Sequence, residues 1–433
     1  MSLEFRRRMI INSLPADIII NRAWSDNDGY LMDVIYAQGW SESKNYMTKS
    51  EAEKVQDIGT IFNSNKSITD FSAFKYFTSV KEVKNSAFGD CFGLKYISFP
   101  NSIEKFGDGA FSRNQALVSP LIFPASTKSI GSSFLTQNSV LEEVVLNEGL
   151  ETIGGQAFSS ANKVKSIFIP KTVKSIGGHC INATCVVEVD SENPYYDSRD
   201  NCNAIIKTSS NTLTSGNTLT KFVEGIEEIA YWSMNGSPSI IHMPSTLKSI
   251  RMQAFSSIAS IKEVYLNEGL KTIDSYAFSN CGNMTVFNFP TTLTGCMPNA
   301  ITGTPFYRSL SDGLLYINDW VWTYKNSANN TNIDVIVENG YTRLGDFAFD
   351  GNFSFIKSLD LPDTLTTIGI ASVRGLSKVE RIIIRSNTMQ FNNSYVSSVN
   401  KNCVFYVPDD RMNYYSGLIS GFVMEPLSSL TQS

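Results

Sequence analysis

The side chains best suited to acid–base chemistry are scarce, because the 433-residue sequence contains only two histidines. General acid–base catalysis most often uses histidine. His179 lies beside Cys180, and His242 falls in an apolar segment that ends at Pro244. A Cys–His or Ser–His nucleophile also needs a third group to orient the base, and the sequence offers no such set. We therefore predict structural roles for both histidines and no catalytic residues.

Metal and phosphate sites are also weakly represented. The seven cysteines are scattered and form no C-x-x-C pair, which favours buried thiols over the alternatives of metal ligands or disulfides. The Asp- and Asn-rich stretch 197–203 lacks the glycine and final glutamate of a calcium loop and is typical of a turn. No GK[ST] phosphate loop occurs. We predict no metal and no cofactor.

Composition restricts the partners. A net charge of −5 disfavours nucleic acid, which usually selects a basic surface. No apolar run approaches the roughly 18–20 residues that span a bilayer. Hydrophobic residues make up 42% of the chain and charged residues only 18%, so many exposed positions must be Ser, Thr or Asn. This balance suits an extracellular or virion surface, with neither nucleic acid nor membrane as partner.

Aromatic residues outside the repeated part of the chain are the better binding candidates. Tyr and Trp supply large, stiff contact surfaces with a polar group, and they suit stacking on sugar rings. The alternative is that these rings pack inserted hairpins onto the rest of the fold. On the binding interpretation, replacing Trp320 and Trp322 weakens binding and leaves the fold intact. The candidates are Tyr195, Tyr196, Trp232, Tyr307, Tyr316, Trp320, Trp322 and Tyr324.

The elements that must position these residues come from an apolar cassette that returns about every 23 residues. Each copy has an Ile or Val, then Ala-Phe, then an alternating segment that a proline often closes. Such a period predicts a solenoid, in which short strands of successive copies pair into parallel ladders, joined by turns or short helices. The predicted core residues are Phe88, Phe111, Phe134, Phe158, Phe255, Phe278 and Phe349.

The cassette is absent from both ends and is interrupted twice. Thr48 and Glu51 form a capping box that predicts a short helix in an N-terminal cap. Both interruptions contain paired alternating runs that predict β-hairpins. The predicted organisation is an N-terminal anchoring or assembly arm (1–44), an N-terminal cap (45–78), the solenoid (79–385) with insertions at 190–222 and 296–340, and a C-terminal cap (386–433).

The cassette I-x-x-x-A-F-x-x-C-x-x-L-x-x-I-x-[IFL]-P is similar to that of the BspA-like bacterial leucine-rich repeats. The copy from Phe88 to Pro100 matches it almost position for position. The resemblance covers about residues 79–427 and implies a leucine-rich repeat solenoid with a role in surface recognition. The segments 3–9, 45–51 and 74–78 resemble leaders of such repeats in prophages and tailed phages of gut bacteria.

These observations predict a non-enzymatic recognition protein. The apolar segment after Arg8 is broken by Asn12, Pro15 and Asp17, so we expect no secretion signal there, which favours a virion. The leading hypothesis is a phage fibre or decoration protein on the virion surface. Its partners would be other virion proteins through the arm, a bacterial surface protein or glycan, and further copies of itself. The alternative is a bacterial cell-surface adhesin that binds host proteins or glycans; an enzyme is the least favoured class.

Overall fold

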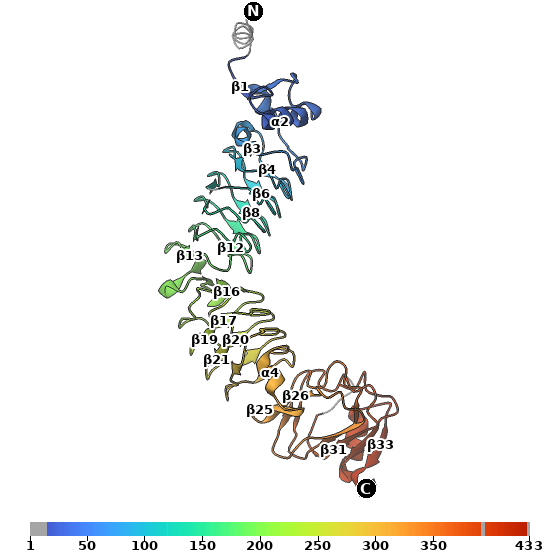
Figure 1. The fold of residues 1–433 in the computed structure, drawn as a ribbon. Helices are drawn as coiled ribbons and strands as arrows, with labels where there is room; N and C mark the ends of the chain where they lie inside the picture. The colour runs from blue at the N-terminus through green and yellow to red at the C-terminus, as the bar shows by residue number, and fades with distance from the viewer. Residues whose placement is uncertain (1–14, 119, 391–394, 431–433) are drawn as a thin grey trace, which may run out of the picture. The chain divides into compact units, whose positions relative to one another are not determined.

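A computed structural model describes residues 15–118, 120–390 and 395–430. The chain forms a β-solenoid of stacked coils with a period of about 23 residues, as predicted (Figure 1). It divides into two compact units, the first ending at Pro238 and the second beginning at Ser239. Each unit is described separately below. Residues 1–14, the first part of the predicted arm, lie outside the described residues.

The sequence placed residues 18–37 in the arm, but their apolar side chains join the same buried core as those of the predicted cap 45–78. The cap of the first unit, here residues 15–78, combines short strands and helices. The helix α2 is capped by Ser25, whose hydroxyl accepts from the Asp28 amide, and it buries Leu31, Met32 and Ile35. The capping box of Thr48 and Glu51 is present, which confirms the predicted short helix. The elements are β1 (Ile18–Asn21), α2 (Asp26–Ala37), β2 (Tyr46–Thr48), α3 (Lys49–Ala52), β3 (Asp70–Phe71) and η1 (Ser72–Tyr76).

Aromatic rings join this cap to the first coil. The ring of Phe62 stacks on Phe88 with centroids 5.4 Å apart, and Phe88 stacks on Phe111 at 5.0 Å. Phe71 and Phe74 also contact Phe88. The cap therefore shields the end of the solenoid core, as an end-cap must if the first coil is not to expose its apolar face.

Successive coils of the first unit each give a two-residue strand to a parallel sheet, called here the first ladder. Thr152 pairs with Ser129 on one side and Ser175 on the other, and Ile153 points into the core. The residues that point outward are polar or charged. The strands are β4 (Glu82–Val83), β6 (Lys105–Phe106), β8 (Ser129–Ile130), β10 (Thr152–Ile153) and β12 (Ser175–Ile176).

A second set of strands, the second ladder, lies later in each coil. The apolar residues Ile167 and Ile169 are buried, and Phe168 between them points outward. Pairing is again parallel, between β3 and β5, between β7 and β9, and between β11 and β13. The strands of these coils are β5 (Tyr96–Ile97), β7 (Leu121–Ile122), β9 (Val144–Val145), β11 (Ser166–Ile169) and β13 (Val186–Val189).

The turn after each first-ladder strand requires two special backbone positions. A Cβ on Gly154 would lie 2.3 Å from the Ser132 nitrogen of the adjacent coil, so only glycine fits. Two residues later the backbone enters the left-handed region, with φ of 58° at both Gln156 and His179. The next residue, Ala157 in this coil, is fully buried. Tight coil-to-coil stacking therefore accounts for the glycine and alanine of the cassette.

One core position differs from the sequence prediction. The Phe88 amide donates to the Ala110 carbonyl, and the Phe111 amide donates in the same way to the Phe134 carbonyl. Phe134 thus occupies the alanine position of its coil, and Leu135 takes the phenylalanine position. This coil is one residue longer than its neighbours. Because Phe134 and Leu135 are both apolar, the sequence does not show which of them takes the phenylalanine position. All seven predicted core phenylalanines are fully buried.

Side chains of the first interruption hydrogen-bond to backbone groups of the last coil before it, where the next coil would otherwise pair. Its antiparallel hairpin β15–β16 confirms the predicted one. The Tyr196 hydroxyl accepts from the Ile176 amide at 3.0 Å, and Asn193 donates to the carbonyls of Pro170 and Val173. The elements are β14 (Tyr196–Asp197), η2 (Arg199–Asn201), β15 (Ala204–Lys207), β16 (Thr212–Asn217), β17 (Glu228–Ile229) and β18 (Met234–Asn235).

The second unit repeats the same design and contains the second predicted hairpin, confirmed as the antiparallel pair β25–β26. Its early coils comprise β19 (Ile240–His242), β20 (Ser249–Ile250), β21 (Glu263–Tyr265), β22 (Thr272–Ile273), β23 (Val286–Phe287) and β24 (Gly295–Cys296). The interruption comprises α4 (Pro305–Ser309), β25 (Gly313–Ile317) and β26 (Trp320–Lys325). The last coils and the C-terminal segment comprise β27 (Ile333–Ile336), β28 (Arg343–Leu344), β29 (Ile356–Leu361), β30 (Thr367–Ile368), β31 (Arg381–Ile384), β32 (Val404–Val407), η3 (Asp409–Arg411), α5 (Met412–Leu418), β33 (Val423–Pro426) and η4 (Leu427–Ser429).

Candidate functional site

Three of the eight aromatic candidates are buried and cannot present their rings to a ligand as the chain is folded. Tyr196, Trp320 and Trp322 are 5%, 3% and 1% exposed. The Trp322 indole N–H donates to the Cys296 carbonyl at 3.0 Å, and its ring packs against Phe289. The interpretation of Trp320 and Trp322 as binding residues that the fold can lose is therefore corrected, because removing them would open a cavity in the core.

Three further candidates are half-buried by packing around the second hairpin. Tyr307 meets the ring of Trp322 edge-on at 6.2 Å. Tyr316 stacks on Tyr341 with centroids 3.9 Å apart, and burial raises its pKa to about 12. Tyr324 lies against Phe355. These contacts agree with the alternative interpretation given in the sequence analysis: the aromatic rings pack the inserted hairpin onto the solenoid.

The two remaining candidates are exposed, and one of them belongs to a cluster. Tyr195 is 47% exposed and Trp232 is 39% exposed. Trp232 stacks on His179 with centroids 4.9 Å apart and planes 21° from parallel. Tyr231, 51% exposed, lies 6.4 Å from Trp232 at an interplanar angle of 51°. We call His179, Tyr231 and Trp232 the aromatic patch.

The aromatic patch is uncharged. Burial lowers the pKa of His179, although a backbone hydrogen bond with Met234 opposes the shift, so the imidazole is neutral at pH 7. Trp232 has a φ of 44° and therefore occupies the left-handed turn position that His179 occupies in the preceding coil. The sequence could not predict the contact of His179 with Trp232, because the two residues lie 53 positions apart.

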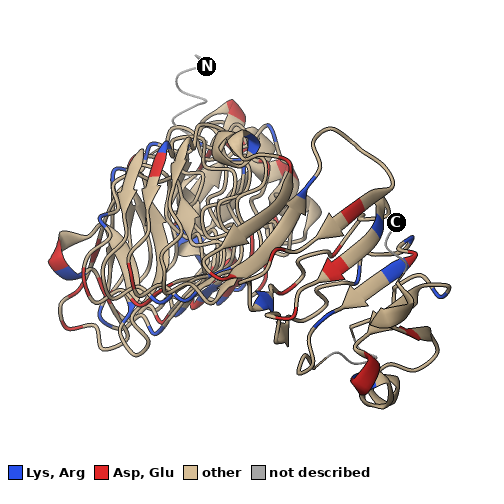
Figure 2. Ribbon diagram, turned by 90° about the horizontal axis from the view of Figure 1, so that it is seen from below, with Lys and Arg blue, Asp and Glu red and all other residues tan. Residues whose placement is uncertain are grey.

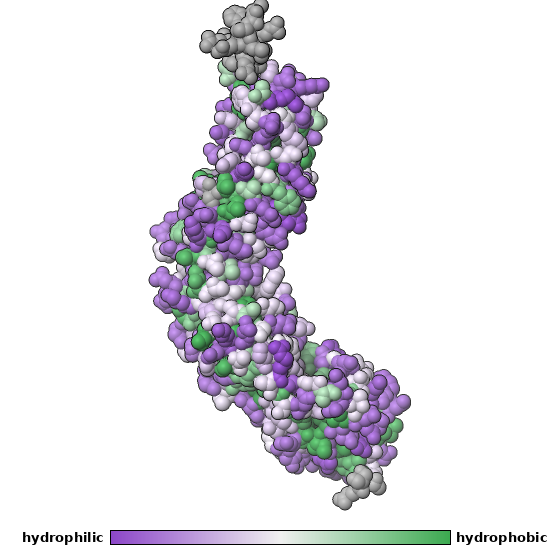
Figure 3. Space-filling view, in the orientation of Figure 1, coloured by the Kyte–Doolittle hydropathy of each residue, from purple (hydrophilic) through white to green (hydrophobic). Residues whose placement is uncertain are grey.

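A second exposed feature escaped the sequence prediction. Ile122, Val145 and Phe168 are 57%, 40% and 46% exposed, and each is the outward residue of a second-ladder strand on one of three successive coils. We call them the apolar column. The signal was present in the sequence, because a half-buried strand normally alternates apolar and polar residues, whereas segments such as 144–146 and 167–169 are apolar throughout. Figure 3 shows hydrophobic residues as small groups among hydrophilic ones on the surface of the first unit.

The first ladder has the opposite character. Opposite charges alternate from coil to coil beside its strands, and Glu151 contacts both Lys128 at 3.9 Å and Lys174 at 2.6 Å. Lys81 and Glu104 form a similar pair. Figure 2 shows acidic and basic residues interspersed along the coils. These exposed pairs contribute little to stability and leave no surplus of one sign, so this face is not suited to a strongly charged partner.

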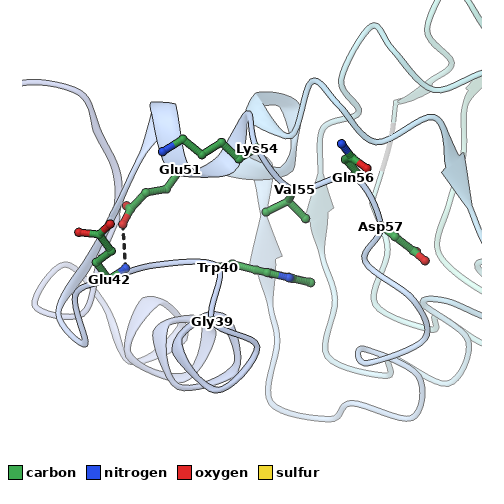
Figure 4. A pocket seen from close by; sticks show the side chains of 8 residues that line it. All are labelled: Gly39, Trp40, Glu42, Glu51, Lys54, Val55, Gln56 and Asp57. Atoms are coloured by element: carbon green, nitrogen blue, oxygen red, sulfur yellow. Dashed lines mark hydrogen bonds between the residues drawn. The ribbon is translucent and has the colours of Figure 1, made fainter.

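A surface pocket in the cap is lined by Trp40, Val55 and several polar residues (Figure 4). Its most enclosed carboxylate, Glu51, is already engaged. Burial raises the pKa of this group, but hydrogen bonds from the Thr48 and Glu42 amides and from the Thr48 and Ser41 hydroxyls outweigh burial and lower it. Glu51 therefore serves the capping box, and a second lining carboxylate, Asp57, contacts Lys84.

We next searched the described residues for a metal-binding cluster, a disulfide and a membrane-spanning helix. No group of three or more His, Cys, Asp or Glu side chains lies close enough there to hold a metal ion. All seven cysteines are buried and unpaired, and burial raises the pKa of Cys91 to about 12 and that of Cys185 to about 11. Within the described ranges, no helix has the length and apolar character needed to cross a bilayer.

The sequence profile of the BspA-type leucine-rich repeat region matches residues 57–186, 206–309 and 307–410. The chain belongs to this family. The match confirms the resemblance seen in the cassette and assigns both ladders to leucine-rich repeats. A search of curated proteins gave no match to the sequence.

Several solved structures are similar to this chain. The pneumococcal vaccine antigen PcpA is 18% identical, with 80% of this chain and 78% of that chain covered and a TM-score of 0.40. A leucine-rich cell surface protein from Faecalibacterium prausnitzii A2-165 is 17% identical, with 79% and 84% covered and a TM-score of 0.40. A leucine-rich repeat protein from Bacteroides ovatus ATCC 8483 is 19% identical, with 85% and 89% covered and a TM-score of 0.30.

Proposed function

We propose that this BspA-type solenoid is a non-enzymatic recognition protein that attaches to a macromolecule on a bacterial surface. The observation that carries the proposal is the apolar column, in which Ile122, Val145 and Phe168 expose aliphatic and aromatic surface on successive coils. The fold does not require an apolar residue at this strand position, because Glu188 is the residue paired with Phe168 in the next strand of the second ladder. Exposed apolar surface in a regular array is typical of a binding face.

The test replaces the column while keeping its strands. The variant Ile122→Thr, Val145→Thr and Phe168→Thr places β-branched threonine at all three positions, and threonine suits strands. We expect binding of the labelled full chain to bacterial cells, measured by flow cytometry, to fall at least tenfold while the melting temperature stays nearly constant. The control carries Ser129→Ala, Thr152→Ala and Ser175→Ala on the first ladder and should bind normally. Equal binding by both variants would remove the apolar column as the contact surface.

We propose the surface of a phage particle as the place of action, as a fibre or decoration protein held through the N-terminal region to other virion proteins. The resemblance of segments 3–9, 45–51 and 74–78 to phage-encoded leaders supports this location. The alternative is the bacterial cell surface, where the same solenoid would act as an adhesin for host proteins or glycans. Antibody labelling in electron micrographs separates the two: label on purified particles supports the virion, and label on the cell envelope supports the adhesin.

Several copies on one particle or cell would increase avidity, which matters if single contacts are weak. Self-association is therefore part of the proposal. A mass determination on the purified full chain, by light scattering after size exclusion, tests it. A trimer or other oligomer agrees with a fibre, and a monomer restricts multivalency to the array on which the chain is displayed.

A further inference from the structure

Two glycines beside the aromatic patch are not explained by the fold. A Cβ on Gly155 would lie 3.4 Å from the Gly178 carbonyl, and a Cβ on Gly178 would lie 3.4 Å from the Tyr231 carbonyl. Both distances are ordinary contacts, and neither glycine has a positive φ. Gly154 and Gly177 differ, because a Cβ on either would come within 2.3 Å of the adjacent backbone. The coils therefore require glycine at 154 and 177 but not at 155 and 178.

Neither position carries a side chain, and Gly155 is half-buried while Gly178 is exposed. We call these two backbone positions the floor. The same turn position carries Asp108 and Ser132 in earlier coils. The carbonyls of Ser132 and Gly155 accept equivalent hydrogen bonds from the amides of Gly109 and Ser133, each in the preceding coil. Tyr231 follows Gly178 in this series, since the Gly178 Cβ site faces its carbonyl. Its exposed ring, tilted by 51° to Trp232, stands at the end of the floor.

One side of the floor is bordered by neutral hydrogen-bonding groups. Ser133, Gln156, His179 and Trp232 share the left-handed turn position, with φ of 54°, 58°, 58° and 44°. The Ser133 hydroxyl lies 3.4 Å from the Gln156 side-chain oxygen. None of these side chains carries a charge at pH 7, because burial lowers the pKa of His179. The row offers a hydroxyl, an amide, an imidazole and an exposed indole, and the exposed ring of Tyr231 lies beside the indole.

We propose that the floor of Gly155 and Gly178, with the aromatic patch at its end, is a binding site for a neutral saccharide. The apolar C–H face of a pyranose ring stacks on an exposed aromatic ring, and its hydroxyls hydrogen-bond to neutral side chains. An anionic glycan or a charged peptide finds no complementary charge among the residues of the site. The floor is exposed at Gly178 and half-buried at Gly155, which suits a chain of sugar units more than an apolar side chain that needs an enclosed pocket.

This inference deepens the proposed recognition function and rests on it, but it uses a different surface from the apolar column. The probe is an array of neutral and anionic oligosaccharides, followed by calorimetry of the full chain with the neutral oligosaccharide that binds best. We expect Trp232→Ala and Gly178→Gln each to weaken that binding at least tenfold. Alanine is tolerated at this turn position, since Ala371 has a φ of 52° in another coil. Gln at 178 fills the floor without touching the core.

Two matched controls carry the same changes elsewhere. Trp24→Ala removes a tryptophan that is 59% exposed in the cap, and Gly417→Gln adds a side chain to a glycine with open space around it. Both should bind the saccharide within twofold of the wild type. The inference is overturned if no neutral oligosaccharide binds, if only anionic glycans bind, or if both site variants bind normally. The apolar-column variant should retain saccharide binding, so loss of cell attachment in that variant alone tests the proposed function and not this site.

Discussion

At the scale of single residues, neighbouring glycines provide a sharp test of coil packing. Gly154→Ala should destabilise the fold by about 1–3 kcal/mol, because the new methyl group would clash with the Ser132 backbone of the adjacent coil. Gly155→Ala should be neutral or stabilising by about 0.4–1 kcal/mol, because it restricts the unfolded chain without a clash. Urea unfolding of both variants gives the free energies. Equal effects would contradict the distinction between required and unrequired glycines.

The buried thiols predict how stability depends on pH. Burial raises the pKa of Cys281 to about 12, well above its ordinary value of 9.0. The folded thiol therefore keeps its proton where the unfolded thiol loses it, so its contribution is complete below pH 9 and is lost progressively as pH rises toward 12. In Cys281→Ala, the alkaline decline in the free energy of unfolding should be shallower, by up to about 1.4 kcal/mol per pH unit. Chemical denaturation from pH 8 to 10.5 measures the slope, and identical slopes would show that this thiol is not shielded.

At the scale of elements, the first interruption acts as an internal cap of the first ladder. Tyr196→Phe removes the hydroxyl that accepts from the Ile176 amide, so the last strand loses a hydrogen bond at its edge. We expect a loss of about 1 kcal/mol in the free energy of unfolding. Tyr195→Phe is the matched control, because its ring is 47% exposed, and it should leave stability unchanged. If the two variants melt together, the hydroxyl does not serve as a cap.

The sequence predicted the repeated elements well and the orientation of the inserted ones poorly, for a physical reason. The cassette is shaped by local packing, so its glycine, alanine and proline positions mark each coil. The hairpin with Trp320 and Trp322 has apolar residues on both faces, and only contacts with distant coils decide which face is buried. Phe134 was placed one position off for the same reason, since the coil-to-coil hydrogen bonds set its register. The aromatic patch likewise depends on His179 meeting Trp232 across an insertion.

At the scale of the whole molecule, the first unit combines a continuous core with two different surfaces. The core of the first unit extends from Ile20 in the cap to Ile205 in the first hairpin. The charged first ladder is self-compensating, whereas the second ladder exposes the apolar column on the same coils. A solenoid can use one ladder for solubility and the other for binding, because each coil contributes a strand to both. Recognition by this chain then depends on an array of similar positions and not on one deep pocket.

Such an array also predicts how damage spreads. In a stacked solenoid each coil contacts only its neighbours, so stability is close to a sum of local terms. Phe158→Ala creates a cavity at a fully buried position of the first unit and should cost about 3–5 kcal/mol there. Hydrogen exchange should show faster opening in residues 15–238 and a much smaller change from Ser239 onward. Phe278→Ala, an equally buried position of the second unit, should give the reverse pattern. Uniform loss of protection along the chain in both variants would contradict this prediction, because it would mean that the two units unfold as one. A substitution in any single coil would then lower the stability of both units.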